Sequence, residues 1–358
     1  MKAEDKKYIE RCFELAGRGA GHASPNPLVG SVIVKNGRII AEGWHEKYGG
    51  PHAEANAINH ALEDTEGATL YCNLEPCCHT NKKTPPCTTK IIGSKIKRVV
   101  ISNVDPNPFV AGKGIAQLRS FGIEVETGIL EDEGRYLNRF FFKHITTGMP
   151  YVTLKIAQSL DGRIASEKGK QTWLTGKESA EFVHSQRAVY DAVLIGANTV
   201  NVDNPQLNVR MVKGRNPKRI IIDGNLNSSI DARIFNDELT ENTILFTCGK
   251  SDAGKLTLLQ NKGVTIFRLP GDVDNKISIQ EILKILGSEN VTSLFIEGGR
   301  EIFTQFIKEN LFDEMVILQA PVTLGKGISA FDVDFPSNLK EISSEMLGND
   351  KKTVYLTP

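Results

Sequence analysis

The feature that most constrains the fold is a set of metal-binding side chains within residues 52–87. The segment opens with His52-Ala53-Glu54 and holds two further donors, Cys77 and Cys87, each preceded by a proline and, like His52, placed beside a predicted helix start. Zinc in proteins prefers nitrogen and sulfur ligands in a tetrahedron, and a catalytic zinc keeps three protein ligands and one water. The chain must therefore fold so that these two cysteines meet the histidine.

Glu54 is suited to move a proton at such a site. Two residues along a helix, its side chain points in a different direction from His52 and can approach a bound water from the side. Zinc lowers the pKa of its water from 15.7 to about 7, and a carboxylate there can pass the water's proton to a leaving ammonia. The alternative is a structural zinc site closed by Cys78 or His79 as the fourth ligand.

The loop between the two cysteines is longer than in the general zinc nucleobase-deaminase pattern. That pattern is His-x-Glu followed by Pro-Cys-x-x-Cys. Here Thr80 occupies the position of the second cysteine, and the next cysteine beyond Cys78 is Cys87. The pattern thus indicates deaminase chemistry with a modified loop.

Charge and cysteine usage limit the functional classes. Lys+Arg and Asp+Glu number 43 each, whereas a general nucleic-acid binder is expected to carry a basic excess. We therefore expect small-molecule substrates and no nucleic-acid partner. We find no signal peptide and no apolar run of membrane-spanning length, and four of the six cysteines cluster within residues 72–87. These features favour metal ligation in a reducing cytoplasm, with no membrane partner.

The apolar periodicity predicts two α/β domains, residues 1–147 and 148–358, joined near Thr147-Gly148. Asn36-Gly37 between two apolar runs predicts a hairpin, and Ser278 is expected to cap a helix together with Glu281. Strands are expected at 29–34, 38–42, 69–74, 98–103, 123–126, 151–157, 192–195, 219–222, 243–246, 264–268, 293–296 and 314–318, and helices at 8–16, 52–62, 178–189, 279–286 and 301–309.

Together these motifs resemble the bifunctional riboflavin-biosynthesis deaminase/reductase family. In the first half the resemblance rests on residues 25–30, 52–54, 74–79, 83–87 and 105–108; in the second half it rests on Lys155 and residues 159–162, 173–175, 196–199, 203–207 and 297–299. The long loop between the cysteines is itself a family feature, with one extra residue here around Asn81-Lys82. The resemblance implies an N-terminal cytidine-deaminase-like α/β/α domain and a C-terminal dihydrofolate-reductase-like α/β domain.

For the first domain, the resemblance implies a zinc ion held by His52, Cys77 and Cys87, with Glu54 as the proton shuttle. The substrate would be a diaminopyrimidinone carrying a ribosylamino 5'-phosphate, which is hydrolysed to a uracil and ammonia. Judged without the family, an asparagine between prolines could be an ordinary turn residue, and His45 a satisfied loop histidine. The substrate contacts implied are Asn26, His45, His79, Lys83, Asp105 and Asn107.

For the second domain, the resemblance implies NADPH-dependent reduction of the ring-opened ribosyl group to a ribityl chain. A strand ending in Gly298-Gly299 before a helix could hold a phosphate on free N–H groups, or could be a mere tight turn. Lys155, Asp203 and Glu297 are the candidates for proton management. The NADPH contacts implied are Ala157, Trp173, Thr199, Asp203, Gly299, Arg300, Glu301, Ile302 and Phe303; the substrate contacts are Gln171, Arg187, Leu207, Arg210 and Glu297.

Some of these positions have other interpretations. Gln171 stands where the family has a small hydroxyl residue, and Trp173 could equally be a core aromatic. Arg187 and Arg210 fit a sugar phosphate, but could also be solvated surface arginines. For the whole chain, the alternatives are a zinc deaminase for a nucleoside or a tRNA base, and a non-catalytic zinc-stapled binding module. The family also tends to form homo-oligomers.

Overall fold

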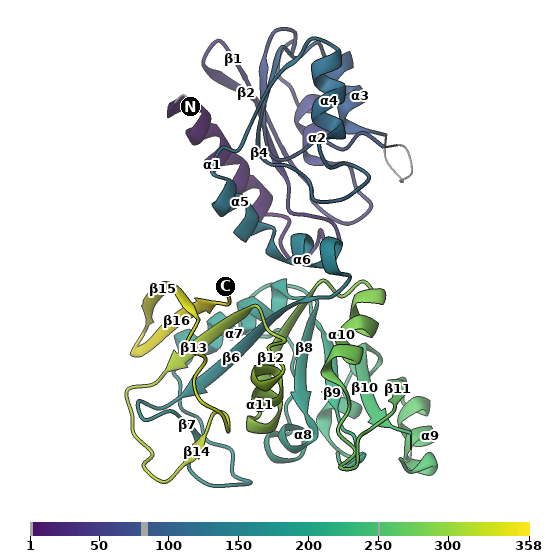
Figure 1. The fold of residues 1–358 in the computed structure, drawn as a ribbon, viewed down its shortest axis with the longest axis vertical. Coiled ribbons are helices and arrows are strands. Elements are labelled where there is room, and N and C mark those ends of the chain that lie inside the picture. Colours follow the sequence, from purple (N-terminus) through teal and green to yellow (C-terminus); the bar gives the residue numbers. More distant parts are fainter. Residues whose placement is uncertain (1–2, 80–84, 250) are drawn as a thin grey trace. The chain divides into compact units, whose positions relative to one another are not determined.

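The structure is a computed structural model that describes residues 3–79, 85–249 and 251–358. The chain divides into two compact units, Met1–Gly148 and Met149–Pro358 (Figure 1). Lys83, and the extra loop residue expected around Asn81-Lys82, lie outside the described residues. In the described parts of the chain, no helix is long and apolar enough to span a membrane.

The first unit is built on a mixed five-stranded sheet with the order β2-β1-β3-β4-β5. β1 runs antiparallel to β2 and β3, whereas β3, β4 and β5 are parallel. The strands are β1 (Gly30–Lys35), β2 (Arg38–Trp44), β3 (Thr69–Leu74), β4 (Arg98–Asn103) and β5 (Glu124–Thr127); the helices are α1 (Ala3–Gly17), α2 (Ala53–Asn59), α3 (Cys87–Gly93), α4 (Lys113–Ser120), α5 (Glu131–Leu137) and α6 (Arg139–Thr147).

Alternating side chains divide this sheet into two buried faces. Ile33 and Leu70 pack with the alanines of α2, whereas Val32 and Tyr71, one residue along each strand, pack with α1. Helices α1 and α5 therefore cover one face, and α2, α3 and α4 cover the other (Figure 1). The result is the expected three-layer α/β/α arrangement.

Local signals in the sequence correctly predict one hairpin and one helix cap, but fail at one helix start. The hairpin between β1 and β2 is confirmed, because Asn36 and Gly37 both have positive φ, 52° and 74°. Ser278 caps α10 (Ile279–Ser288) as predicted, since its side chain accepts a hydrogen bond from the Glu281 backbone N–H. The expected helix start beside Cys77 is wrong: Cys77 lies in an extended loop after β3, whereas His52 caps α2 and Cys87 opens α3.

The second unit has a nine-stranded sheet with the order β11-β10-β9-β8-β12-β6-β13-β16-β15, parallel up to β13 and antiparallel beyond it. β7 and β14 form a separate small sheet. The strands are β6 (Tyr151–Gln158), β7 (Arg163–Ala165), β8 (Ala192–Gly196), β9 (Lys218–Ile222), β10 (Thr243–Cys248), β11 (Thr265–Leu269), β12 (Ser293–Gly298), β13 (Glu314–Gln319), β14 (Ile328–Ser329), β15 (Lys340–Leu347) and β16 (Asp350–Leu356); the helices are α7 (Lys177–Val189), α8 (Ala197–Asp203), α9 (Ala253–Asn261), α10 (Ile279–Ser288) and α11 (Arg300–Lys308).

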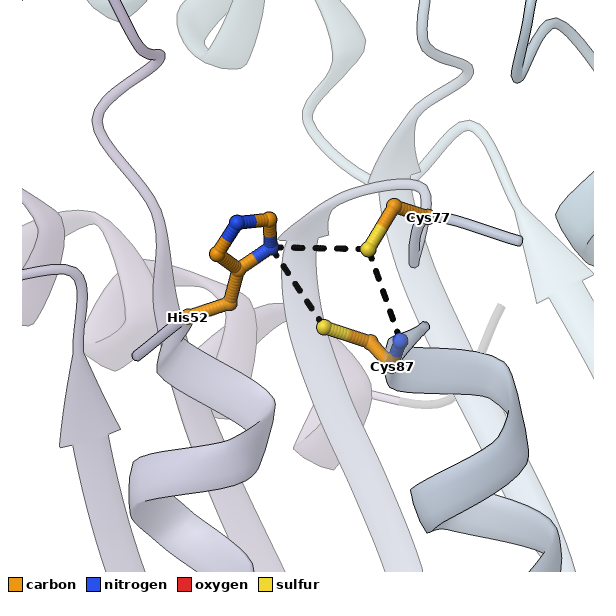
Figure 2. A group of neighbouring side chains, drawn as sticks. All are labelled: His52, Cys77 and Cys87. Carbon is orange, nitrogen blue, oxygen red and sulfur yellow. Dashed lines mark hydrogen bonds between the residues drawn. The ribbon is translucent and has the colours of Figure 1, made fainter. Parts of the chain in front are cut away.

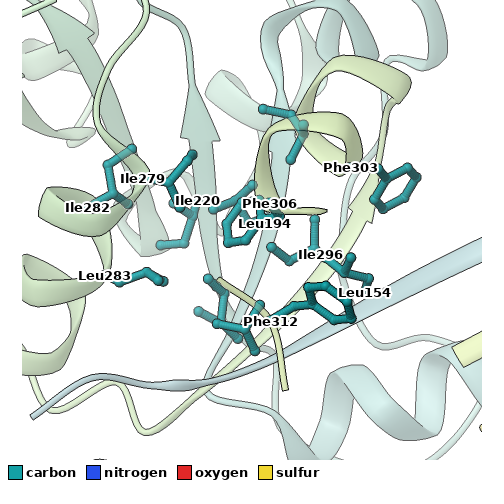
Figure 3. Close-up of a cluster of buried hydrophobic side chains, with 14 of the residues drawn as sticks. Leu154, Leu194, Ile220, Ile279, Ile282, Leu283, Ile296, Phe303, Phe306 and Phe312 are labelled. Carbon is teal, nitrogen blue, oxygen red and sulfur yellow. The ribbon is translucent and has the colours of Figure 1, made fainter. Parts of the chain in front are cut away.

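The main core of this unit lies on one face of the large sheet. Leu154, Leu194 and Ile296 point to that face and pack against α10 and α11 (Figure 3). The next residues along two of these strands, Lys155 and Glu297, consequently point to the opposite face. This alternation brings polar side chains from neighbouring strands together.

The sequence did not predict the C-terminal hairpin of β15 and β16. The residues of β15 are exposed on both sides up to Met346, so no apolar alternation marks the strand. Its pairing with β16 comes from backbone hydrogen bonding across a turn at Gly348, which has φ 60°. Backbone pairing with β16, and not burial of its own side chains, therefore places β15 in the sheet.

Candidate active sites

Three zinc-type donors meet at one point of the first unit. The His52 Nδ1 atom lies 3.4 Å from the Sγ atoms of both Cys77 and Cys87 (Figure 2). The donor atoms of the three residues all lie within 4.8 Å of one another, and both thiols are buried. Among the residues that the structure describes, these one nitrogen and two sulfur donors match the three protein ligands of a catalytic zinc.

Cys78 and His79 are not members of this group of three. The Cys78 thiol donates to the Phe109 carbonyl at 3.9 Å, so it points away from the metal position. His79 instead lines the neighbouring pocket, with its ring centroid 6.1 Å from that of Phe109. The geometry therefore favours three protein ligands over a closed structural site.

Glu54 is buried beside the donor group. Within the described part of the chain its Oε2 atom has no hydrogen-bond partner, although only 3% of the residue is exposed. Burial, and then the nearby Cys77, raise the pKa of this carboxyl. An unsatisfied buried carboxylate oxygen costs stability, so its presence here is consistent with a chemical role.

The donor group opens into a pocket of about 320 Å³. Five of the predicted substrate contacts line this pocket: Asn26, His45, His79, Asp105 and Asn107. Phe141 of α6, which the sequence did not single out, also contributes to the wall. Its apolar neighbours gave it the appearance of a core residue, and only the position of α6 reveals the pocket-facing role.

Hydrogen bonds fix the tautomer of His45. Its Nδ1 atom lies 2.9 Å from the Pro51 carbonyl, which can only accept, so Nδ1 carries the proton. The Nε2 atom then accepts from the Asn26 side-chain amide at 3.0 Å. Burial also lowers the pKa of His45 and favours the neutral ring. His45 thus lines the pocket with both ring nitrogens bonded within the protein, as expected of a satisfied loop histidine.

Two buried asparagines that the sequence did not reveal hold the loop carrying Asn26. Asn73 on β3 accepts from the Gly30 backbone N–H and donates to the Leu28 carbonyl. Asn138, between α5 and α6, both accepts from and donates to the Leu28 backbone. Such distant side-chain to backbone contacts leave no local signal in a sequence.

The loop after β4 presents Asp105 and Asn107. The Asp105 carboxylate accepts from the Asn107 backbone N–H at 2.8 Å, and the Asn107 side chain accepts from the Phe109 N–H at 3.0 Å. Burial raises the pKa of Asp105 to about 7, with the N–H bond from Asn107 opposing it. Consecutive Asx turns thus shape this part of the pocket.

In the second unit, the predicted acid–base residues form one charged cluster. Burial lowers the pKa of Lys155, and the negative charges of Glu297 and Asp203 oppose that shift. Burial raises the pKa of Asp203, which Lys155 in turn opposes. The cluster joins β6, β12 and the end of α8, although its members are far apart in the sequence.

Arg187 and Glu297 form a bidentate pair. The guanidinium Nε and Nη2 atoms donate to the two carboxylate oxygens at 2.5 and 2.8 Å, and both side chains are about 90% buried. A third bond runs from Arg187 Nη1 to the Asn208 carbonyl at 3.1 Å. The alternative of a solvated surface arginine is therefore wrong for Arg187.

Arg210 differs from Arg187, because its side chain is exposed. Its Nη1 atom donates to the Asn208 side chain at 2.8 Å, and its backbone N–H donates to His184 Nδ1 at 3.2 Å. Leu207, in the same loop, is buried with φ 51°. Buried His184, which the sequence did not identify, has a pKa lowered to about 4 by burial and by the two arginines.

The strand-Gly-Gly-helix junction lies against the start of α8. A Cβ atom placed on Gly299 would lie 3.3 Å from Thr199 Oγ1, so Thr199 borders the junction at the start of α8. Gly299 caps α11 without any side-chain hydrogen bond to the helix start. Inside the helix, the Phe303 N–H donates to the Gly299 carbonyl, and the side chains of Ile302 and Phe303 are buried.

The remaining predicted contacts lie at the end of β6, in the loop before α7 and in the first turn of α11. Ala157 lies one residue before the end of β6. Gln171 is exposed, and Trp173 is 80% exposed, so the interpretation of Trp173 as a core aromatic is wrong. Arg300 donates to Asp332 at 2.7 Å, and Glu301 is exposed at the first turn of α11.

Comparisons with known proteins decide the family. A model described as the cytidine and deoxycytidylate deaminase zinc-binding region matches residues 2–103, and one described as the RibD C-terminal domain matches residues 150–353. The riboflavin biosynthesis protein RibD of Aquifex aeolicus is 43% identical over 352 residues, which cover 97% of this chain and 96% of that protein. The chain belongs to the RibD family.

Solved RibD structures agree over the whole length. The Acinetobacter baumannii RibD structure is 36% identical with a TM-score of 0.89, and covers 99% of both chains. A Thermotoga maritima structure, named as a diaminohydroxyphosphoribosylaminopyrimidine deaminase/5-amino-6-(5-phosphoribosylamino)uracil reductase, is 38% identical with a TM-score of 0.87 and the same coverage. The expected fold is thus confirmed, and the protein is a bifunctional RibD enzyme with a zinc-binding deaminase domain and a reductase domain.

Proposed function

We propose that residues 1–147 deaminate 2,5-diamino-6-(5-phosphoribosylamino)pyrimidin-4(3H)-one, and that residues 148–358 reduce the product, 5-amino-6-(5-phosphoribosylamino)uracil, with NADPH. The observation that carries the first half is the buried Glu54 oxygen beside His52, Cys77 and Cys87 at a pocket of about 320 Å³. The observation that supports the second half is the charged cluster of Lys155, Asp203 and Glu297.

In the deaminase site, each residue has a separate task. A zinc ion held by His52, Cys77 and Cys87 would lower the pKa of a water molecule at the amino-bearing carbon. Glu54 takes a proton from that water and delivers it to the amino group, so that a carbon–oxygen bond forms, a carbon–nitrogen bond breaks and ammonia leaves.

The pocket side chains hold the heterocycle and its substituents. Asn26, His79, Asp105 and Asn107 offer hydrogen-bonding groups toward one space. The His45 ring forms part of the same wall and orients the Asn26 amide. Oriented amide, imidazole and carboxyl groups suit the edge of an aminopyrimidinone, because its donors and acceptors alternate. Lys83, for which we make the same proposal from the sequence, would add a positive charge toward the phosphate.

In the reductase site, the protein supplies orientation, charge and a proton. NADPH supplies the hydride that reduces the aldehyde or imine carbon of the opened ribosyl group. Lys155 donates the proton that the adjacent heteroatom gains, since burial lowers its pKa and Asp203 and Glu297 lie within its electrostatic reach.

Binding groups surround that cluster. Arg210, exposed beside buried Arg187, presents a guanidinium to the sugar phosphate, while Glu297 orients the substrate. The cofactor contacts we propose are Ala157, Trp173, Thr199, Asp203, Gly299, Arg300, Glu301, Ile302 and Phe303; the further substrate contacts are Gln171, Arg187 and Leu207.

We extend the proposal to a cytoplasmic homo-oligomer without a nucleic-acid partner. None of the six cysteines is in a disulfide, which suits a reducing compartment. Equal numbers of acidic and basic residues give no basic excess for nucleic acid. Light scattering of the purified protein would measure the assembly.

One assay tests the central proposal. Purified zinc-loaded protein receives the diaminopyrimidinone phosphate with and without NADPH, and both ammonia and the absorbance of NADPH are followed. We expect ammonia in both reactions and NADPH consumption in one. Absence of ammonia would overturn the deaminase assignment, and ammonia without NADPH oxidation would overturn the reductase assignment.

A further inference from the structure

Glu75 is a buried carboxylate that neither the metal site nor the proposed proton transfer uses. It follows the last residue of β3, lies two residues before Cys77 and lines the pocket, yet only 3% of it is exposed. Its oxygens accept three backbone N–H bonds. Oε2 accepts from Asp105 at 3.3 Å and from Gly112 at 2.9 Å, and Oε1 accepts from Ile115 at 3.1 Å.

All three donors belong to one segment, the loop after β4 and the first turn of α4. Gly112 caps α4 with φ 79° and has no side chain, so the N–H groups of Gly112 and Ile115 would lose their acceptor without Glu75. A carboxylate near the helix N-terminus is also favoured by the helix dipole. Glu75 therefore caps α4 from a neighbouring strand.

The same segment carries the substrate-facing groups Asp105 and Asn107. The Asx turns described above link them to each other and to Phe109, so anchoring the Asp105 backbone also sets where Asn107 lies. Because Glu75 binds both ends of this loop, Asp105 and Gly112, it fixes the loop as a unit.

The segment also packs directly against the metal donors. Val110 forms a buried cluster with Cys77 and Cys87. In α4, a Cβ atom on Gly114 would lie only 2.2 Å from the Pro76 carbonyl oxygen, which shows how closely this helix approaches the chain before Cys77. The position of the substrate loop relative to the metal donors therefore depends on this contact.

We propose that Glu75 is a positioning residue that sets the placement of Asp105 and Asn107 relative to the zinc ligands, and so controls substrate affinity of the deaminase. This inference rests on the proposed deaminase function. Glu75 does not touch the reacting atoms in this role; it acts through the loop that it caps.

The test replaces one acceptor oxygen by a donor of the same size. Glu75→Gln keeps the shape but turns an NH₂ group toward one set of backbone N–H donors, which releases part of the loop. We expect the deaminase KM to rise by roughly tenfold or more, with a smaller change in kcat, since loosening a positioning contact weakens binding geometry. Zinc content and NADPH oxidation with preformed uracil substrate should match the unmodified enzyme. Glu133→Gln, an exposed change in α5, is the matched control.

A double-mutant cycle separates positioning from general stability. If Glu75 acts through the loop, Glu75→Gln should raise KM much less in an Asn107→Ala background than in the unmodified enzyme. The Glu75→Asp variant keeps the charge, so its deaminase KM should lie between those of the unmodified enzyme and Glu75→Gln.

The outcomes are distinguishable from those of the main proposal. Unmodified protein that releases no ammonia overturns the deaminase function itself. Active unmodified protein with an unchanged KM in Glu75→Gln overturns the positioning role. Loss of zinc with a parallel fall in kcat, or fully additive effects with Asn107→Ala, would show that Glu75 supports the metal site or the fold and not the substrate loop.

Discussion

The two sites of this chain are prepared for their chemistry in opposite ways. In the first unit, a buried carboxylate oxygen of Glu54 has no partner among the described residues, and three metal donors face one another. In the second unit, Arg187 and Glu297 already satisfy each other through two hydrogen bonds. The first site keeps one carboxylate oxygen without a hydrogen bond beside its metal donors, whereas the second site holds its buried carboxylate in a pair with an arginine.

Metal removal should affect the two units most differently. Cys87→Ser, or incubation with a strong chelator, should abolish ammonia release, because the protein would lose one of three zinc ligands or the metal itself. Reduction of preformed uracil substrate should continue. Zinc analysis and the two assays on one sample check this prediction, and Cys12→Ser, a buried cysteine outside the site, controls for loss of a thiol. Equal loss of both activities would contradict the separation.

Removing one partner of the Arg187–Glu297 pair should destabilise the second unit, because this site depends on paired charges. Glu297→Ala leaves the Arg187 charge buried without its carboxylate, and we expect the free energy of unfolding of the second unit to fall by about 3–5 kcal/mol. Chemical denaturation measures the change, with the exposed Glu289→Ala as the control. Glu54→Gln in the first unit removes an unsatisfied charge and should cause no such loss. A Glu297→Ala variant as stable as its control would refute the pairing argument.

The stability of the second unit should depend on acid pH through His184. Its pKa is about 4 in the folded chain against an ordinary value of 6.5, so between these values the unfolded chain binds more protons than the native one. The free energy of unfolding should therefore fall as the pH drops from about 6.5 to about 4, and level off below. Thermal unfolding at several pH values checks this, and His184→Gln should flatten the slope. A slope unchanged in that variant would assign it to other groups.

Trp173 should show the smallest effect on stability. Because 80% of the residue is exposed, Trp173→Ala should change the free energy of unfolding by less than about 0.5 kcal/mol. The KM for NADPH should nevertheless rise several-fold, since we propose that the indole contacts the cofactor. Leu160→Ala, at another exposed apolar side chain of this unit, is the control. An unchanged KM for NADPH would remove Trp173 from the proposed cofactor site.

The same contrast explains what the sequence could predict. Residue type and spacing predict the zinc ligands His52, Cys77 and Cys87 and the proton carrier Glu54. The structure brings the three ligands together. Glu75, with its long-range backbone contacts, and the exposed strand β15 have no such signal. Their roles arise from tertiary hydrogen bonds, which neither periodicity nor composition encodes.

Prediction in the second unit depended more on the family resemblance than on the residues themselves. Arg187 and Glu297 lie in separate elements, and only the fold shows that they are paired and buried. Nothing in the sequence marks His184 as buried, because a histidine within an amphipathic helix pattern resembles any surface residue. The burial that alters its pKa comes from the loop that carries Leu207 and Arg210.

The most direct test of two separate chemistries is the Glu54→Gln variant, measured for zinc content, ammonia release and NADPH oxidation in one preparation. We predict bound zinc at the level of the unmodified enzyme, ammonia release reduced by roughly 10²- to 10⁴-fold through loss of the proton carrier, and normal reduction of preformed uracil substrate. Normal ammonia release, or loss of both activities in a folded, zinc-loaded variant, would contradict the claim that the two sites work separately.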